Sequence, residues 1–245
     1  MSPTATSKKV HVVLQGKGGV GKSYIASLLA QYHQHHQFPL VCMDTDPLNA
    51  TLMDYQSFKT RRIALMDGST LLERGFDAMI EAILAEDAHF VVDNGAATFI
   101  PLTNYLIEND AIRMMANAKK TVVIHTVVTG NQAMLDTLRG LDDLCQQLPA
   151  EAEVVVWLNE FFGAIEMDGK AFEQMAVYVK HRARISSLVR IPRQTSSTFG
   201  TDVALMLEKK LTFADVDQSV DFGLMAKQRL THVKRTIFDQ LAHVV

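Results

Sequence analysis

Residues 15–24 read Q-G-K-G-G-V-G-K-S-Y, and this stretch decides the fold of the chain. From Gly16 to Ser23 it fits the pattern G-x-x-x-x-G-K-[ST], in which backbone N–H groups cradle phosphate oxygens. In that pattern Lys22 reaches the β- and γ-phosphates of a nucleotide, and the Ser23 hydroxyl binds Mg²⁺. The predicted nucleotide-binding residues are Gly16, Lys17, Gly18, Gly19, Val20, Gly21, Lys22, Ser23 and Tyr24.

The residues on both sides of this loop support the same interpretation. Lys9–Gln15 is rich in β-branched residues, as a buried strand would be. A strand, a glycine-rich loop and a helix in this order aim the helix N-terminus at a bound anion. A glycine-rich turn with incidental lysines is the alternative, and this context disfavours it. The apolar residues that recur on one face of the predicted helix are Ile25, Leu28, Leu29 and Tyr32.

The composition is that of an ordinary globular protein. Of 245 residues, 48% are hydrophobic and 21% are charged, and the net charge of −3 draws the chain neither to nucleic acid nor to membrane. Cys42 and Cys145 stand apart, which predicts buried thiols in a reducing compartment. We find no signal-peptide pattern and no apolar run of membrane-spanning length, so we expect a cytoplasmic location.

Apolar runs alternate with helical patterns along the chain. This alternation predicts one α/β P-loop domain over residues 1–245, with a mostly parallel twisted sheet and helices on both faces. We expect residues 1–7 to be frayed and residues 219–245 to hold a C-terminal helix. The predicted strands are Lys9–Gln15, Leu40–Met43, Phe90–Asp93, Thr121–Val128, Val154–Leu158 and Ser186–Ile191, with a short edge strand at Arg62–Met66. The predicted helices are Ser23–His36, Leu71–Ala85, Asn131–Leu148 and Lys170–Val179.

Ligands bind parallel sheets at the carboxyl ends of the strands, so polar residues there are candidates for chemistry. The second strand ends in Asp44-Thr45-Asp46-Pro47, and its two carboxylates point the same way in an extended backbone. One carboxylate could place a water molecule while the other approaches a metal. Asp-Pro is also turn chemistry, but beside a phosphate loop we favour the functional interpretation.

Two further strand ends carry polar residues. An apolar strand that ends in an aspartate, here Asp93, is how P-loop proteins hold Mg²⁺, and a plain D-N-G turn is the alternative. Gly95 would let the backbone turn toward the γ-phosphate. Asn159 follows another apolar strand, and its amide offers a donor and an acceptor that suit an adenine edge or, equally, a cap or turn.

The lysine pair in K-G-G-V-G-K-S resembles the deviant Walker A loop of the ParA/MinD family of ATPases. D-T-D-P at residues 44–47 and I-P-R at residues 191–193 resemble later motifs of that family. More closely, V-L-Q-G-K-G-G-V-G-K-S, D-T-D-P-x-N-A-T, V-D-N-G-A, H-T-V-V-T-G, V-V-W-L-N and R-I-P resemble TraL-type conjugal-transfer proteins of broad-host-range plasmids. Related plasmid-stability ATPases are similar.

The resemblance implies ATP and Mg²⁺ as ligands and a homodimer that forms when ATP binds. Lys17 matches the lysine that reaches the other subunit's nucleotide in that family. Asp46 matches its water-activating aspartate, and Asp93 matches a residue of its Mg²⁺ shell. Asn159 and Pro192 match its adenine-edge region. The predicted catalytic residues are therefore Lys17, Lys22 and Asp46, and the predicted metal ligands are Ser23 and Asp93.

The chain departs from the family pattern at both acidic motifs. Leu48 replaces the usual glutamine after D-T-D-P, the glycine that follows it is missing, and D-N-G-A stands where D-C-P-P is usual. No DNA-reading extension precedes the loop, so we do not expect operator binding of the longer ParA type.

The stretch from Lys180 to Thr201 has no acidic residue. Its cations would form a local positive patch for non-specific DNA binding if they share one face. They would form scattered, partly paired surface charge if they do not, and the sequence leaves both open. The cations are Lys180, Arg182, Arg184, Arg190 and Arg193.

The predicted C-terminal helix has an apolar stripe bordered by Lys227 and Lys234, as in helices that lie on membranes. We favour packing of the stripe on its own domain, which is the commoner use of such a helix. The stripe consists of Leu230, Val233, Ile237, Leu241 and Val244.

Three histidines, His33, His35 and His36, lie at the end of the first predicted helix. Their spacing places them on different helical faces. We therefore expect solvated side chains and not a metal cluster.

The function that these patterns favour is a Mg²⁺-dependent ATPase that switches between monomer and dimer and hydrolyses slowly. Water would attack the γ-phosphorus, placed by Asp46, while Lys17 and Lys22 offset the developing charge. By resemblance the setting is plasmid conjugation or plasmid maintenance, with a protein partner from that system. The alternative is a nucleotide-gated adaptor that recruits a partner to DNA or membrane with little hydrolysis. A metabolic ATP-dependent enzyme is less favoured, because no residue set marks a small-substrate pocket.

Overall fold

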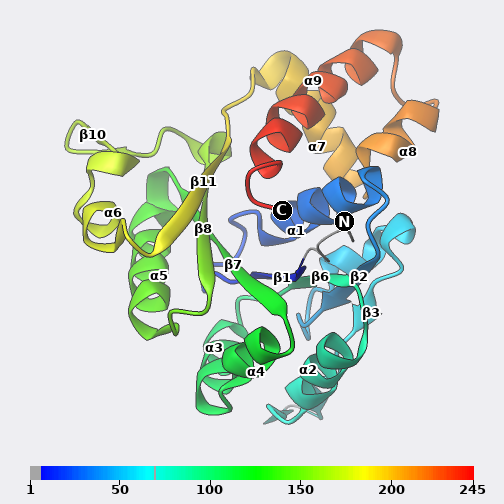
Figure 1. The fold of residues 1–245 in the computed structure, drawn as a ribbon. Coiled ribbons are helices and arrows are strands. Elements are labelled where there is room, and N and C mark those ends of the chain that lie inside the picture. Colours follow the sequence, from blue (N-terminus) through cyan, green and yellow to red (C-terminus); the bar gives the residue numbers. More distant parts are fainter. Residues whose placement is uncertain (1–6, 69) are drawn as a thin grey trace, which may run out of the picture.

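A computed structural model describes residues 7–68 and 70–245, and these residues form a seven-stranded sheet (Figure 1). Every neighbouring pair of strands in it is parallel. The predicted α/β fold with a mostly parallel sheet is therefore confirmed. From one edge to the other the strands are β11 (Ile185–Ile191), β8 (Glu153–Asn159), β7 (Lys120–Thr129), β1 (Lys8–Val13), β6 (His89–Asp93), β2 (Leu40–Asp44) and β3 (Arg61–Arg62).

Helices cover both faces of the sheet (Figure 1). Strand residues alternate between two apolar cores, so Phe90 and Val92 pack into one core and Val91 packs into the other. The first core is completed by α2 (Gly75–Ala85), α3 (Phe99–Glu108), α4 (Ala111–Asn117), α5 (Met134–Gln147) and α6 (Ala176–His181). The second core is completed by α1 (Lys22–His35), α7 (Thr201–Glu208), α8 (Phe213–Gln218) and α9 (Leu224–Leu241).

The predicted edge strand at Arg62–Met66 is wrong over most of its length. Strand β3 ends at Arg62, and Met66 belongs to a separate antiparallel hairpin of β4 (Met66–Asp67) and β5 (Thr70–Leu71). A short edge strand leaves few unpaired backbone groups, which limits pairing with other chains.

The predicted helix at Lys170–Val179 is wrong in its first half. A second hairpin, of β9 (Glu166–Met167) and β10 (Lys170–Ala171), occupies that region and turns at Asp168 and Gly169, both with positive φ. The helix expected from Leu71 likewise begins only at α2. In both places the first residues of the predicted helix belong to the second strand of a hairpin, which follows left-handed residues at Gly68 or at Asp168 and Gly169.

Four helices, α3, α4, α7 and α8, were not predicted. Pro101 lies in the first turn of α3, where the missing N–H costs nothing, yet it obscures the helical pattern. Asp110, with a φ of 49°, separates α3 from α4. Short helices broken by such residues carry too little periodicity to stand out.

The C-terminal helix packs on its own domain, as favoured. All five stripe residues, from Leu230 to Val244, are at most 5% exposed. The helix begins at Leu224, five residues later than expected. Among the described residues, no helix has both the length and the hydropathy that crossing a bilayer requires.

The frayed N-terminus that we expected concerns residues 1–6, which lie outside the described residues, and Ser7. The Ser7 hydroxyl donates to the Lys119 carbonyl oxygen at 2.8 Å, so this residue is tied to the start of β7.

The expectation of solvated histidines is wrong for His33, which is fully buried, and holds for His35 and His36. His33 lies one helical turn after Leu29, so it continues the apolar face of α1 toward the sheet. Its ring centroid is 5.1 Å from that of His11, and it lies 4.6 Å from that of His89. No group of three metal-ligating side chains suited to hold an ion occurs in the part of the chain that the structure describes.

Candidate nucleotide-binding site

The loop between β1 and α1 turns through two glycines in the left-handed conformation, Gly19 and Gly21, with φ of 74° and 101°. A Cβ at Gly21 would also lie 2.9 Å from the Asn159 amide nitrogen, so this position strongly favours glycine. Helix α1 begins directly afterwards, at Lys22, and its open first-turn N–H groups are suited to an anion. The predicted strand, loop and helix are present.

Lys22 is buried, and its ammonium group donates to the Lys17 carbonyl oxygen at 3.0 Å. Burial lowers the pKa of Lys22, and the nearby Asp93 and Asp46 oppose that change. A phosphate oxygen would replace this neutral carbonyl partner with a full negative charge, which an ammonium group binds more strongly.

Lys17 has a different partner, a residue that the sequence analysis did not single out. Its ammonium nitrogen lies 2.8 Å from Asp136 Oδ2. The Lys17 side chain is 42% exposed and the Asp136 side chain is 46% exposed. Hydrogen bonding to Lys17 lowers the pKa of the Asp136 carboxyl. Asp136 lies in the first turn of α5, at the carboxyl edge of the sheet. That position could have marked Asp136 as a candidate site residue from the sequence.

A cleft of about 380 Å³ separates the loop from the segment after β2. Lys22 and Ser23 line one side, and Asp46 and Asn49 line the other. Strands β2 and β6 are neighbours, with Asp44 beside Asp93 in register. The fold thus brings the predicted phosphate-binding, water-placing and metal-binding residues to one edge of the sheet.

Asp93 is 2% exposed, and its Oδ1 has no hydrogen-bond partner among the described residues. Burial raises the pKa of Asp93 to about 7; Asp44 and Asp46 add to the rise, and the Ser23 hydroxyl and Lys22 oppose it. Burial likewise raises the pKa of Asp44 to about 6. A buried carboxylate oxygen without a partner, next to the Ser23 hydroxyl, is a hard oxygen ligand of the kind that Mg²⁺ prefers, and phosphate and water would complete the shell.

Asp46 forms a local turn as well as facing the cleft. Its Oδ1 accepts from the backbone N–H of Leu48 at 2.9 Å and of Asn49 at 3.0 Å. Asp44 in turn accepts from the N–H of Asp46 at 2.9 Å. The turn interpretation of D-T-D-P and the functional one therefore describe the same residues, because the turn holds the Asp46 carboxylate at the cleft.

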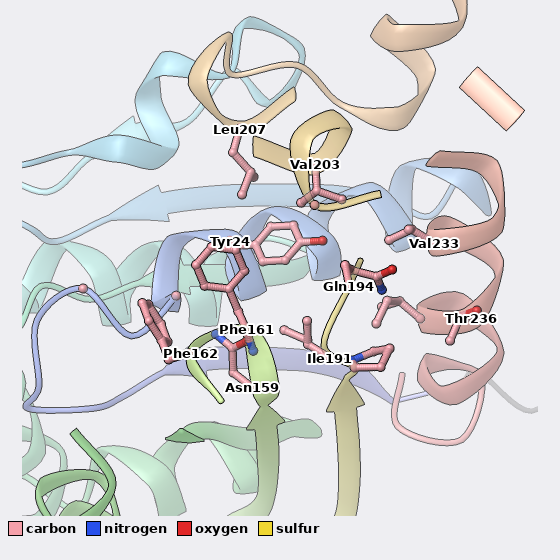
Figure 2. A pocket seen from close by; sticks show the side chains of 15 residues that line it. Tyr24, Asn159, Phe161, Phe162, Ile191, Gln194, Val203, Leu207, Val233 and Thr236 are labelled. Atoms are coloured by element: carbon pink, nitrogen blue, oxygen red, sulfur yellow. The ribbon is translucent and has the colours of Figure 1, made fainter. Parts of the chain in front are cut away.

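A second, largely apolar cavity of about 160 Å³ lies next to the cleft (Figure 2). Tyr24, Phe161 and Phe162 surround one end of it, and Val233 and Thr236 of α9 lie at the other. Pro192, one of the two residues predicted to lie near the adenine edge, lines this cavity. The sequence analysis missed Phe161 and Phe162, although two adjacent aromatic residues directly after a strand end were a usable signal. The cavity and the cleft share Gly19, Gly21 and Tyr24, so one ligand can occupy both.

Asn159 is 3% exposed, and both ends of its amide have partners. The amide nitrogen donates to the Val20 carbonyl oxygen at 3.0 Å, and the amide oxygen accepts from the Phe161 N–H at 3.2 Å. Of the two interpretations that the sequence left open, this geometry favours the cap. Asn159 joins the end of β8 to the phosphate loop.

The cations between Lys180 and Arg190 do not form one free patch. Lys180 lies 2.7 Å from Asp142 Oδ1, and Arg190 pairs with Glu160 and Glu173. The Arg184 guanidinium donates to the carbonyl oxygens of Leu148 and Pro149, and Arg182 lies 5.7 Å from the Tyr178 ring centroid. The geometry favours the partly paired surface charge.

The fold and the loop define a P-loop protein with the architecture of MinD and plasmid partition proteins. The MinD chain of the MinC:MinD cell division complex of Aquifex aeolicus aligns with a TM-score of 0.51 and 13% identity, covering 94% of this chain and 96% of the other. A putative plasmid partition protein of Borrelia burgdorferi bound to AMPPNP aligns with a TM-score of 0.52 and 11% identity, covering 97% and 100%. A family model described as the Sigma-54 interaction domain matches residues 2–76, a stretch that includes the phosphate loop but less than half of the chain.

The chain belongs to the TraL family. Two Escherichia coli proteins, each called protein TraL, are 46% and 43% identical to it over 233 residues. Each alignment covers 95% of this chain and 97% of the relative. The resemblance stated from the motifs is thereby confirmed.

Proposed function

We propose that this chain is a Mg²⁺-dependent ATPase that dimerises around two ATP molecules, hydrolyses them slowly, and acts in plasmid conjugative transfer or maintenance. One observation carries the proposal: Lys22 and Ser23 face Asp46 across a cleft that continues into an apolar cavity. The cleft suits a triphosphate with its metal, and the cavity suits a base. The buried, free thiols of Cys42 and Cys145 fit the reducing cytoplasm.

The chain's own residues would act in a simple order. The Lys22 ammonium group would donate to phosphate oxygens in place of the Lys17 carbonyl oxygen. Asp46 would orient the attacking water and accept its proton. Ser23 and Asp93 would hold Mg²⁺, which, when bound, neutralises charge on the β- and γ-phosphates. Tyr24, Phe161 and Pro192 would enclose the base and exclude water from it.

The dimer gives Lys17 its role. In this structure Lys17 is bound to Asp136 of its own chain, and it would leave that carboxylate for the nucleotide of the second subunit. Each site would then lack one cation until the partner supplies it, which makes hydrolysis slow in the monomer. The MinD relative is seen with MinC, and by this analogy we propose a protein partner from the plasmid system.

The test is the mass of the full chain in solution with a non-hydrolysable ATP analogue and Mg²⁺, measured by light scattering. We expect a dimer with the wild type and a monomer with Lys17→Ala, which should still bind the analogue. Lys22→Ala should not bind it at all. A wild type that stays monomeric at saturation would refute the proposed dimer.

The second candidate is an adaptor that binds ATP, recruits a partner to DNA or membrane, and barely hydrolyses. It is favoured by the Asp46 carboxylate, one oxygen of which already accepts two backbone N–H groups and is less available to a water molecule. Turnover of ATP measured with and without DNA and partner protein separates the two candidates. Because α9 packs on its own domain and is not available to lie on a membrane, we favour DNA over membrane as the place to which the adaptor would recruit its partner.

We include non-specific DNA contact as part of this proposal, through Lys180, Arg182, Arg184 and Arg190. Band shifts at low salt with ATP should weaken when Arg182, Arg184 and Arg190 are replaced by Glu. Equal binding by that variant would remove DNA from the proposal.

A further inference from the structure

A buried polar cluster joins the two strand-end segments of the site. It consists of Thr45, Asn94 and Thr98, which are 0%, 1% and 0% exposed. The Asn94 amide oxygen lies 2.8 Å from the hydroxyl of Thr45 and 2.8 Å from the hydroxyl of Thr98, and it accepts from both. The Asn94 amide nitrogen donates to the Gly95 carbonyl oxygen at 2.9 Å. We call these three residues the Asn94 clamp.

The clamp sits directly before two residues that touch across the site. Thr45 precedes Asp46 on the segment after β2, and Asn94 precedes Gly95 on the segment after β6. The Thr45 N–H also donates to the Asp93 carbonyl oxygen at 2.9 Å, so the backbone pairing continues one residue beyond the end of β2.

Gly95 lies against the Asp46 carboxylate. A Cβ at Gly95 would fall 2.6 Å from both the Asp46 carboxyl carbon and Oδ2, closer than real contacts allow. Because Oδ1 is held by backbone N–H groups, the carboxylate cannot move aside without losing them. Gly95 and the turn of residues 46–49 therefore fix Asp46 from two sides.

We infer that Asn94, with Thr45 and Thr98, is a positioning cluster that sets the place of the Asp46 carboxylate relative to the segment after β6. This inference rests on the proposed ATP hydrolysis, in which Asp46 places the water. The hydrogen bonds of Asn94 tie the two segments to each other, so the position of the segment after β6 determines that of Asp46. Of the three residues only Asn94 lines the cleft, and Thr45 and Thr98 act through Asn94, Asp46 and Gly95.

Threonine and valine have nearly the same shape, which provides a matched pair of variants. Thr45→Val removes the hydroxyl that binds Asn94, and Thr45→Ser keeps it. Gly95→Ala leaves every clamp hydrogen bond in place and adds only the methyl group that displaces Asp46. It thus tests the contact even if a clamp variant folds poorly.

The experiment measures, for the full chain with Mg²⁺, the kcat for ATP and the Kd for a non-hydrolysable ATP analogue, with thermal midpoints recorded alongside. Thr45→Val and Gly95→Ala should lower kcat by about ten-fold or more, since small displacements of a water-placing group cost this much or more. Their Kd should stay within about three-fold of the wild type, a change below 1 kcal/mol. Thr45→Ser should keep the wild-type kcat.

A merely structural role would move the thermal midpoint and Kd together with kcat, and that parallel loss would overturn the inference. Wild-type kcat in both Thr45→Val and Gly95→Ala would also overturn it, while leaving the proposed function intact. A wild type that binds the analogue and never hydrolyses ATP would overturn both.

Discussion

Lys17 Nζ lies 2.8 Å from Asp136 Oδ2, and this contact keeps the second lysine of the phosphate loop within its own subunit. In the proposed dimer the same ammonium group serves the other subunit's nucleotide. The intramolecular contact therefore competes with dimerisation. Because each side chain of the pair is nearly half exposed, the competition is weak and can be overcome by a triphosphate.

Asp136→Ala should make dimerisation easier. Release of Lys17 from an exposed ion pair is expected to lower the ATP-analogue concentration for half-dimerisation by about two- to five-fold. Light scattering against analogue concentration measures this. Asp143→Ala is the matched control, since Asp143 is an exposed acid on the same helix that makes no ion pair with Lys17. A higher midpoint in Asp136→Ala than in the control would show that the contact assists the dimer.

Asp46→Ala should bind ATP with Mg²⁺ and remain a dimer, because hydrolysis is the step that it loses. A general base of this kind contributes about 10²- to 10⁴-fold to the rate. Asp46→Asn is the sharper variant, since its amide oxygen can still accept from Leu48 and Asn49 and preserve the turn. Both variants should lose turnover and keep the dimer in light scattering. Normal hydrolysis by Asp46→Asn would contradict the assignment.

The phosphate loop, Asp46 and Asp93 were predictable because each belongs to a short contiguous pattern. A strand followed by glycines predicts a phosphate-binding loop, and an apolar run that ends in a carboxylate predicts a polar residue at the sheet edge, each from a few consecutive residues. Parallel pairing then requires that such ends meet, as the register of Asp44 beside Asp93 shows.

Asp136, Phe161 and His33 were not predictable in the same way. Asp136 matters only because α5 brings it beside Lys17, 119 positions away along the chain. Phe161 lines a cavity whose other walls come from α7 and α9. His33 is buried because α1 turns that face toward a sheet that already holds His11 and His125. Contacts between distant segments decide all three, and the local signals at Asp136 and Phe161 do not say which distant residues they meet.

The buried histidines make stability depend on pH. Burial, first among several causes, lowers the pKa of His33 and His125 to about 3, lowers that of His89 to about 4, and lowers that of His11 well below its usual range. At these four histidines the unfolded state binds more protons than the folded one between about pH 3 and 6.5, so their contribution to stability rises with pH in that window. The histidine contribution is complete above about pH 6.5 and is lost as the pH falls, by at most about 1.4 kcal/mol per pH unit for each histidine. Asp44 and Asp93, whose pKa values are raised to about 6 and about 7, contribute in the opposite direction.

His33→Leu tests this directly, because neither ring nitrogen of His33 has a hydrogen-bond partner among the described residues. Removing an unsatisfied buried polar group should raise the free energy of unfolding at pH 7 by about 1 kcal/mol. It should also reduce the slope of the unfolding free energy against pH by the amount that corresponds to about one bound proton. Urea unfolding between pH 4.5 and 7.5 gives both quantities, with His243→Leu, at an exposed position, as control. An unchanged slope would show that His33 is charged in the folded protein.

Asn159→Ala should lower the affinity of the site for all nucleoside triphosphates by the same factor. Its amide holds the Val20 carbonyl oxygen of the phosphate loop and caps the Phe161 N–H, so its loss loosens the loop and leaves the base cavity chemically unchanged. Two such hydrogen bonds are worth about 1 kcal/mol each, and because the free protein also makes them, the affinity for both ATP and GTP analogues should fall by at most about thirty-fold. Gln194→Ala is the matched comparison, because Gln194 lines the base cavity and makes no side-chain hydrogen bond to the described residues. It should change the ratio of ATP to GTP affinity instead. If Asn159→Ala instead changes the ratio of ATP to GTP affinity and keeps the affinity for GTP, Asn159 contacts the adenine edge, the other role that the sequence left open.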